Sequence, residues 1–201
     1  MKIIGLCGGS GSGKGSVSRL FAGYSILSID TDSVYRKMTE GDSECMRALK
    51  VAFGEKIAQE DGSLDRKALR ELVFSVDDAE KNREILNNIT HKFILDETRR
   101  IIEGERMRGA VAVIVDAPLL FESGFDRECD VIVSVISDED IRVSRIVLRD
   151  GISEDDARKR IKGQLSDEEL IKRSDYVVYN NADLVSLQVQ VVDLYKKIIN
   201  I

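Results

Sequence analysis

The stretch Gly8–Lys14 reads Gly-Gly-Ser-Gly-Ser-Gly-Lys, and it decides the fold. It satisfies the pattern G-x-x-x-x-G-K and stands between a short apolar run, Lys2–Leu6, and an amphipathic helical pattern that starts at Val17. Glycines let the backbone wrap so that its N–H groups face an anion, and the N-terminus of a following helix adds partial positive charge. We therefore predict a phosphate-binding loop in which Lys14 contacts the β- and γ-phosphates of a nucleotide.

The residues after Lys14 depart from the usual pattern. Gly15 stands where a Ser or Thr hydroxyl ordinarily ligates Mg²⁺, and Ser16 follows it. One interpretation is a nucleotide site that has lost its activity. The other is that the stretch resembles the G-K-G-[ST] variant of adenylate kinases. In such a site water, the phosphates and nearby carboxylates hold most of the Mg²⁺ coordination shell, and Ser16 contacts the α-phosphate.

Four further apolar runs have the length of one buried strand each. They are Ser25–Ile29, Val111–Val115, Asp130–Ile136 and Tyr176–Tyr179. Runs of Val and Ile without polar alternation are typical of parallel strands that are covered on both faces. Helical patterns lie between the runs, and strands that alternate with helices predict an α/β fold with a five-stranded parallel sheet.

Two segments interrupt this alternation. Residues 37–108 contain no convincing strand and read as a charged helical insertion, and residues 150–170 form a second, shorter insertion. We expect one domain whose core comprises about residues 1–36, 109–149 and 171–201.

Composition narrows the class of protein. The chain has 201 residues, 43% of them apolar, and its 36 acidic and 30 basic residues give a formal net charge of -6. This excludes a disordered acidic chain, and it predicts no general attraction to nucleic acid or to an anionic membrane. Three widely spaced cysteines indicate a reducing compartment, and no segment resembles a signal peptide or a membrane span. We expect a cytoplasmic protein.

Carboxylates follow two of the predicted strands. Asp30 and Asp32 end the second run and share one face if the strand persists, where one of them could accept a proton from a hydroxyl or orient Mg²⁺. The alternative is a pair of turn-forming aspartates. Asp116 follows the run Val111–Val115 and is a candidate to organise metal-bound water.

Basic residues suited to phosphate chemistry lie on one predicted helix. Arg142, Arg145 and Arg149 share a face at spacings of three and four residues, and guanidinium groups can neutralise a transferring phosphoryl group. A solvated helix face explains the same spacing equally well. His91 is the single histidine, and for it we expect a structural or solvent-facing role from the residues alone.

Several separated segments together resemble the dephospho-CoA kinase family over nearly the full length of the chain. They are Gly5–Lys14, Ile29–Asp32 with Arg36, Asp61–Phe74, Leu86–His91, Asp116–Glu122, Arg145–Gly151, Arg160–Gln164 and Asp175–Asn180. The chain departs from the family pattern at Cys7, Gly15 and Lys92, where threonine, a hydroxyl residue and proline are usual. Of these, only Gly15 bears on the chemistry, through metal geometry.

The resemblance implies transfer of the γ-phosphate of ATP, with Mg²⁺, to the 3′-hydroxyl of dephospho-CoA. It also implies a three-layer P-loop fold in which residues 37–108 bind the acceptor and residues 150–170 form a lid. The implied ATP-binding residues are Gly11, Ser12, Gly13, Lys14, Gly15, Ser16 and Asn180. The implied catalytic residues are the base Asp32, together with Lys14, Arg145 and Arg149. The implied acceptor-binding residues are Arg36, His91, Leu119, Phe121 and Glu122. The implied metal-site residues, acting mostly through water, are Ser16, Asp32 and Asp116.

Three alternatives stay open at this point. A nucleoside or nucleotide monophosphate kinase would share the loop and the arginines. A GTPase would suit the stretch Asn180–Asp183, which echoes N-K-x-D, although Asn181 replaces the lysine. A non-catalytic ATP-binding protein would suit Gly15. The sequence does not indicate the oligomeric state.

Overall fold

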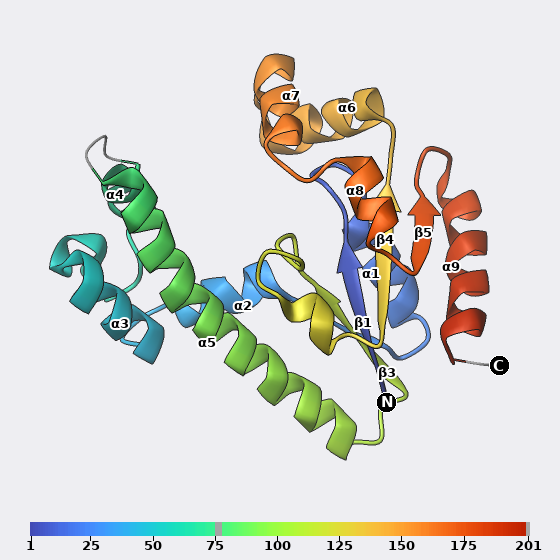
Figure 1. Ribbon diagram of the computed structural model, residues 1–201, viewed down its shortest axis with the longest axis horizontal. Coiled ribbons are helices and arrows are strands. Elements are labelled where there is room, and N and C mark those ends of the chain that lie inside the picture. The colour runs from blue at the N-terminus through green and yellow to red at the C-terminus, as the bar shows by residue number, and fades with distance from the viewer. Residues whose placement is uncertain (75–77, 200–201) are drawn as a thin grey trace. The chain divides into compact units, whose positions relative to one another are not determined.

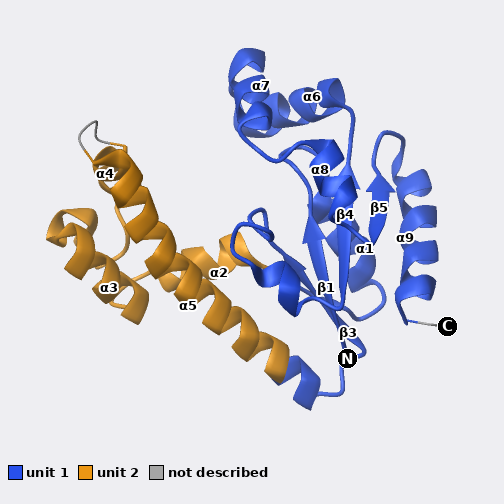
Figure 2. Cartoon of the chain, in the orientation of Figure 1, with its two compact units in different colours: residues 1–29, 104–201 blue, residues 30–103 orange. Residues whose placement is uncertain are grey.

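The computed structural model describes residues 1–74 and 78–199. The chain forms two compact units, residues 1–29 with 104–201 and residues 30–103, which are coloured separately in Figure 2. We call them unit 1 and unit 2. The expected start of the insertion, residue 37, lies inside helix α2 (Thr31–Met38). Its expected end, residue 108, directly follows helix α5 (Ala79–Met107).

A five-stranded parallel sheet organises unit 1, in the order β2-β3-β1-β4-β5, and this confirms the predicted fold class. The strands are β1 (Lys2–Cys7), β2 (Leu27–Asp30), β3 (Ala112–Asp116), β4 (Val131–Ile136) and β5 (Tyr176–Tyr179). The central strand β1 pairs with β3 on one side, Leu6 opposite Asp116, and with β4 on the other, Cys7 opposite Ser134. The second strand starts two residues later than the run Ser25–Ile29 predicts. Ser25 has a φ of 58°, a left-handed conformation that cannot continue a strand.

The sheet is stabilised mainly by apolar packing. Helices α1 (Lys14–Ala22) and α9 (Leu184–Ile199) contribute Phe21 and Val191 to a core whose sheet residues include Ile4 and Ile114, and all four are almost completely buried. Each such side chain contributes about 1.5–3 kcal/mol when it leaves water. Because Ile4 of β1 belongs to this core, the core fixes the position of β1 and of the loop that follows β1.

Three helices lie near the carboxyl ends of the strands. They are α6 (Glu139–Asp150), α7 (Glu154–Lys162) and α8 (Asp167–Lys172). Figure 1 shows α6 and α7 beyond the arrowhead of β4 and α8 beside that strand. Val143 and Ile146 of α6 pack with Ala157 of α7 in a small core of their own. Residues 150–170 therefore form part of unit 1.

Unit 2 is helical in the described residues, apart from one isolated bridge between Ala58 and Leu64. Besides α2 and α5 it contains α3 (Glu44–Phe53), α4 (Arg66–Val73) and a short 3-10 helix, Glu55–Ile57. Met46, Leu49 and Ile57 are fully buried in its core. This unit therefore has apolar packing of its own.

Candidate active site

The loop between β1 and α1 has the conformation that its glycines permit. Gly11 and Gly13 have φ values of 78° and 95°, in a region that residues with a side chain rarely adopt. Gly13 is the N-cap of α1 and provides no side-chain hydrogen bond to the helix. Because the first N–H groups of a helix favour negative charge, an anion can take the place of the missing cap.

Lys14 lies against the loop and against the end of β3. Its Nζ donates to the carbonyl oxygen of Gly8 at 3.0 Å and stands 3.9 Å from Asp116 Oδ1. Both side chains are about 15% exposed, so the two charges are largely removed from solvent. A cation and a carboxylate are thus brought together at the mouth of the loop, and the roles expected for Lys14 and Asp116 stay predictions.

Arg145 and Asn180 hold the loop through its carbonyl groups. Arg145 Nη1 lies 3.2 Å from the carbonyl oxygen of Gly11 and 3.4 Å from that of Ser12, and its Nη2 donates to the carbonyl oxygen of Asn180 at 3.0 Å. Asn180 Nδ2 donates to the Ser12 carbonyl at 2.8 Å. Ser137 Oγ connects the two, since it accepts from Arg145 and donates to the Asn180 carbonyl. Residues from β5, α6 and the end of β4 therefore define the shape of the loop.

A hollow opens beside these groups. Gly13, Ser16, Arg145 and Asn180 line it, together with residues near the start of α9. The Ser16 hydroxyl accepts a hydrogen bond from Arg19 Nη2 at 3.0 Å. The hollow adjoins the N-terminus of α1, so a molecule whose phosphates bind the loop can extend into it.

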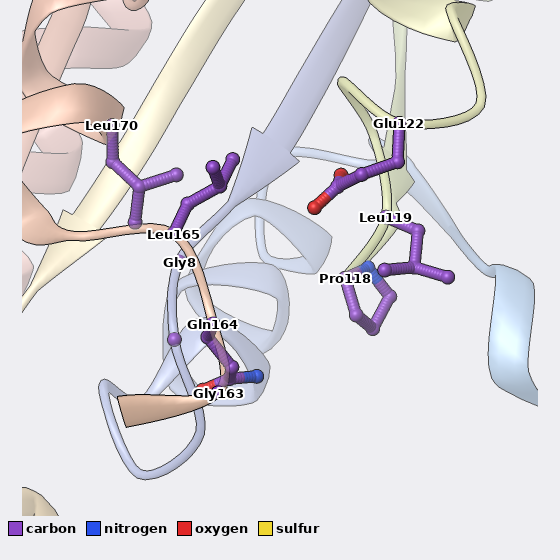
Figure 3. A pocket seen from close by; sticks show the side chains of 9 residues that line it. Gly8, Pro118, Leu119, Glu122, Gly163, Gln164, Leu165 and Leu170 are labelled. Atoms are coloured by element: carbon purple, nitrogen blue, oxygen red, sulfur yellow. The ribbon is translucent and has the colours of Figure 1, made fainter. Parts of the chain in front are cut away.

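A second hollow lies on another side of the loop, and Figure 3 shows its lining. Gly8 borders it together with Leu119, Glu122 and Gln164. In Figure 3 the Glu122 carboxylate is directed into the space from one side, while Gln164 stands beside the loop on the other. Two polar side chains from different segments, Glu122 and Gln164, thus border the space next to Gly8.

The comparisons with known proteins identify the family. The family model described as dephospho-CoA kinase matches residues 2–186. The chain belongs to the dephospho-CoA kinase family. This family catalyses the final step of coenzyme A biosynthesis, and membership decides against the GTPase and the nucleotide kinase alternatives.

Individual relatives agree with this family over almost the whole chain. The dephospho-CoA kinase of Corynebacterium efficiens is 39% identical over 190 residues, which is 94% of each chain. A crystal structure of the protein TT1252 from Thermus thermophilus superposes with a TM-score of 0.80 at 29% identity and covers 98% of this chain and 97% of its own. The shikimate kinase of Acinetobacter baumannii shares the fold alone, with a TM-score of 0.55 at 14% identity, covering 100% of this chain and 94% of its own.

Two residues expected in the family site make contacts outside the loop. Arg149 pairs with the neighbouring Asp150 at 2.7 Å, and Asp150 also pairs with Arg160. These contacts hold the pKa of Asp150 well below its ordinary value. Phe121 is buried, with the guanidinium of Arg173 4.1 Å above its ring. The roles expected for Arg149 and Phe121 stay predictions.

Three other expected residues belong to unit 2. Asp32 and Arg36 are exposed residues of α2, one helical turn apart, and so share a face of that helix. Asp30 has a different task, since its carboxylate caps α2 by accepting from the Asp32 N–H at 3.0 Å and the Ser33 hydroxyl at 2.6 Å. Because β2 ends at Asp30 and Asp32 lies in the first turn of α2, the two aspartates do not share a strand face, the arrangement expected if the strand continued. Asp30 forms the turn, and the role of Asp32 stays a prediction. His91 is half-buried on α5.

Sequence reasoning assigned no role to Gln164 or Asp167, and it placed Arg142 only on a helix face suited to phosphate chemistry, without a contact to the loop. Arg142 Nε donates to the Ser10 carbonyl at 2.9 Å, and Arg142 Nη1 pairs with Asp167 at 3.0 Å. Gln164 Oε1 accepts from the Ser10 N–H at 2.8 Å. The helical spacing of Arg142 and Arg145 shows their shared face, but it does not show that this face covers the loop.

Proposed function

We propose that this protein transfers the γ-phosphoryl group of ATP to the 3′-hydroxyl of dephospho-CoA, with the phosphate-binding loop Gly8–Lys14 as the site of ATP. Family membership gives the reaction, and the proposal concerns the residues that carry it out. The observation that supports it best is the loop itself. Lys14 and Asp116 lie together at its mouth, and Arg145 and Asn180 hold its carbonyl groups.

In this proposal the triphosphate binds the N–H groups of the loop and of the first turn of α1, Gly11 to Ser16. Lys14 neutralises the β- and γ-phosphates, and the nucleoside extends into the hollow beside Asn180. Gly15 is compatible with a bound nucleotide because its position is open, the nearest atom to an added Cβ being Arg19 Nη1 at 3.8 Å. These roles rest on the shape of the loop and on the family resemblance.

We assign Asp32 as the base that accepts the proton of the 3′-hydroxyl. Asp32 is an exposed residue of the first turn of α2, and a carboxylate is the side chain that can accept the proton of a hydroxyl in this reaction. Its N–H is already held by the cap residue Asp30, which fixes the backbone from which the side chain projects. We assign binding of the acceptor, dephospho-CoA, to the helices of residues 37–108. Arg36, on the same face of α2 as Asp32, and His91 are the residues expected to contact it.

Mg²⁺ is the metal ion that the reaction implies. The described residues include no group of three or more His, Cys, Asp or Glu side chains that could hold a metal ion. Asp116, Ser16 and Asp32 fit an ion that is coordinated mainly by water and phosphate oxygens, because each can bind such an ion through a water molecule. When bound, such an ion neutralises charge on the phosphates. What the chain itself supplies there is the Lys14–Asp116 pair and the loop N–H groups.

Glu122, Leu119 and Phe121 are assigned to the acceptor side of the loop, since the first two line the hollow at Gly8. Arg145 and Arg149 are assigned to the phosphoryl group, with residues 150–170 closing over ATP and excluding water. A cytoplasmic location is part of the proposal, and the three free thiols agree with a reducing compartment. Among the described residues, none of the helices is both long and apolar enough to span a membrane.

A direct experiment separates this proposal from its neighbours. The purified protein is incubated with ATP, Mg²⁺ and one acceptor at a time: dephospho-CoA, AMP, CMP or uridine. The expected products are ADP and coenzyme A, which is dephospho-CoA phosphorylated at its 3′-hydroxyl, identified by mass spectrometry and ³¹P NMR. Turnover of a nucleoside or nucleotide without turnover of dephospho-CoA would refute the proposal.

A further inference from the structure

Arg142 is a buried cation that joins the phosphate-binding loop to the start of α8. Its side chain is about 4% exposed, and its Nε and Nη1 bind the Ser10 carbonyl and the Asp167 carboxylate. Its Nη2 is buried without a hydrogen-bond partner. Because leaving a buried donor unpaired costs free energy, this placement needs a reason beyond simple packing.

The loop is shaped to accept Arg142. A Cβ added to Gly9 would overlap the guanidinium, whose Cζ would be only 2.7 Å away. A Cβ added to Gly11 would approach the backbone oxygen of Arg142 to 2.6 Å. Two glycines of the loop therefore give α6 room to approach at this one residue.

The hydrogen bond to Ser10 has a consequence for the concave side of the loop. In a trans peptide the C=O and the following N–H point in opposite directions. Since Arg142 holds the Ser10 carbonyl, the N–H of Gly11 points away from the Arg142 guanidinium. The same reasoning applies to Ser12, whose carbonyl is held by Asn180 and Arg145 and whose next N–H is that of Gly13. Donors on the outside of the loop thus set the direction of the N–H groups that an anion would meet.

The other end of the Arg142 contact lies at the start of α8, directly after the segment that joins α7 to α8. Gln164 of the connecting segment accepts from the Ser10 N–H, and Asp167, the first residue of α8, pairs with Arg142. Ser10 is therefore bound at its N–H by Gln164 and at its carbonyl by Arg142. A change in the position of residues 164–167 acts on both groups of one loop residue.

We propose that Arg142 is a positioning residue of the ATP site, which sets the orientation of the Ser10–Gly11 peptide and makes that orientation depend on Asp167. The inference rests on the proposed ATP site in the phosphate-binding loop. Arg142 acts through the loop backbone, so its loss affects the binding of phosphates and not the binding of the acceptor.

Three variants test this role. Arg142→Met keeps an unbranched apolar stem but removes the hydrogen bonds and the charge. Arg142→Lys keeps the charge, and Asp167→Asn removes the negative charge of the ion pair. The control is Arg158→Met. Arg158, like Arg142, forms ion pairs, but its partners are the surface carboxylates Glu139 and Asp140. The KM for ATP, the KM for dephospho-CoA and the Kd of a non-hydrolysable ATP analogue are measured where circular dichroism shows each variant folded.

For Arg142→Met we expect the KM for ATP and the Kd of the analogue to rise by about 10-fold or more, the effect of one hydrogen bond to a charged group. The KM for dephospho-CoA should stay within about twofold of wild type, within the usual scatter of distant surface changes. Asp167→Asn and Arg142→Lys should show smaller increases. The double variant Arg142→Met/Asp167→Asn should match Arg142→Met alone, because both changes act through one contact.

Other outcomes overturn the inference. Loss of thermal stability in Arg142→Met with both KM values unchanged would mean a structural ion pair only. Equal increases in the KM for ATP and the KM for dephospho-CoA would also contradict the assigned role. If Arg142→Met does not fold, the same measurements on Asp167→Asn and Arg142→Lys test the role. A wild-type protein that fails to bind ATP would refute the proposed function, whereas normal wild-type activity with unaffected Arg142 variants would refute the inference alone.

Discussion

Replacing Arg145 with methionine removes a guanidinium that supports the phosphate-binding loop through several carbonyl groups. In the structure this group lies near the carbonyl oxygens of Gly11, Ser12 and Asn180. Two of these keep another donor, because Asn180 Nδ2 binds the Ser12 carbonyl and Ser137 Oγ binds the Asn180 carbonyl. The Gly11 carbonyl loses the donor that orients it.

The magnitude follows from that count. A hydrogen bond to a charged group contributes about 1.5–3 kcal/mol net, and one such contact on the loop is lost without replacement. We therefore expect Arg145→Met to weaken ATP binding by about 10- to 100-fold. Arg145→Lys keeps the charge but cannot reach all the acceptors together, so its loss of affinity should be smaller.

Isothermal titration with a non-hydrolysable ATP analogue measures this directly, and thermal unfolding confirms that each variant is folded. Arg158→Met is the matched control, since it removes an arginine of the same unit whose partners Glu139 and Asp140 are remote from the loop in sequence and exposed. A change of less than about twofold for folded Arg145→Met, equal to that of the control, would refute the reasoning about the loop.

Three further predictions concern the base, the thiols and Gly15. Asp32→Asn should lower kcat at least about 100-fold with little change in the Kd for ATP, whereas Asp30→Asn should retain most activity because asparagine caps a helix as well as aspartate; equal kcat values for the two variants would exclude Asp32 as the base. Burial raises the pKa of Cys45 to about 11 and that of Cys129 to about 12. Unfolded thiols ionise near about 8.5, so the contribution of these two groups to the free energy of unfolding should fall as pH rises from there toward 11. Urea titrations of wild type and a Cys45→Ala/Cys129→Ala variant check this, and an identical pH dependence would contradict it. Gly15→Ser should leave Tm unchanged or slightly raised, because its Cβ has open space and serine suits a first helical turn better than glycine; a fall of several degrees in a thermal melt would show that the space is not free.

The sheet and the loop could be predicted because their signals are local. Runs such as Val111–Val115 are apolar without alternation, and the glycines of Gly8–Lys14 allow the positive φ angles that a tight phosphate-binding loop needs. The predicted start of the second strand was wrong because of one backbone conformation. Ser25 reads as part of an apolar run, but its left-handed conformation delays the strand.

The contacts around the loop could not be predicted, because they join distant parts of the chain. Arg142 and Ser10 are 132 residues apart, and nothing in the sequence near either residue specifies the other. Helical spacing also puts Arg149 on the face of Arg142 and Arg145. The adjacent Asp150 pairs with Arg149, a contact that helical spacing does not predict, and the role of Arg149 stays a prediction.

The most direct test of the central claim is a nucleotide-binding and transfer measurement on wild type and Lys14→Met in parallel. The account predicts that wild type converts dephospho-CoA and ATP to coenzyme A and ADP, and that Lys14→Met loses both ATP affinity and turnover. Undiminished ATP binding and turnover in Lys14→Met would contradict it, since the triphosphate would then bind somewhere other than the loop between β1 and α1.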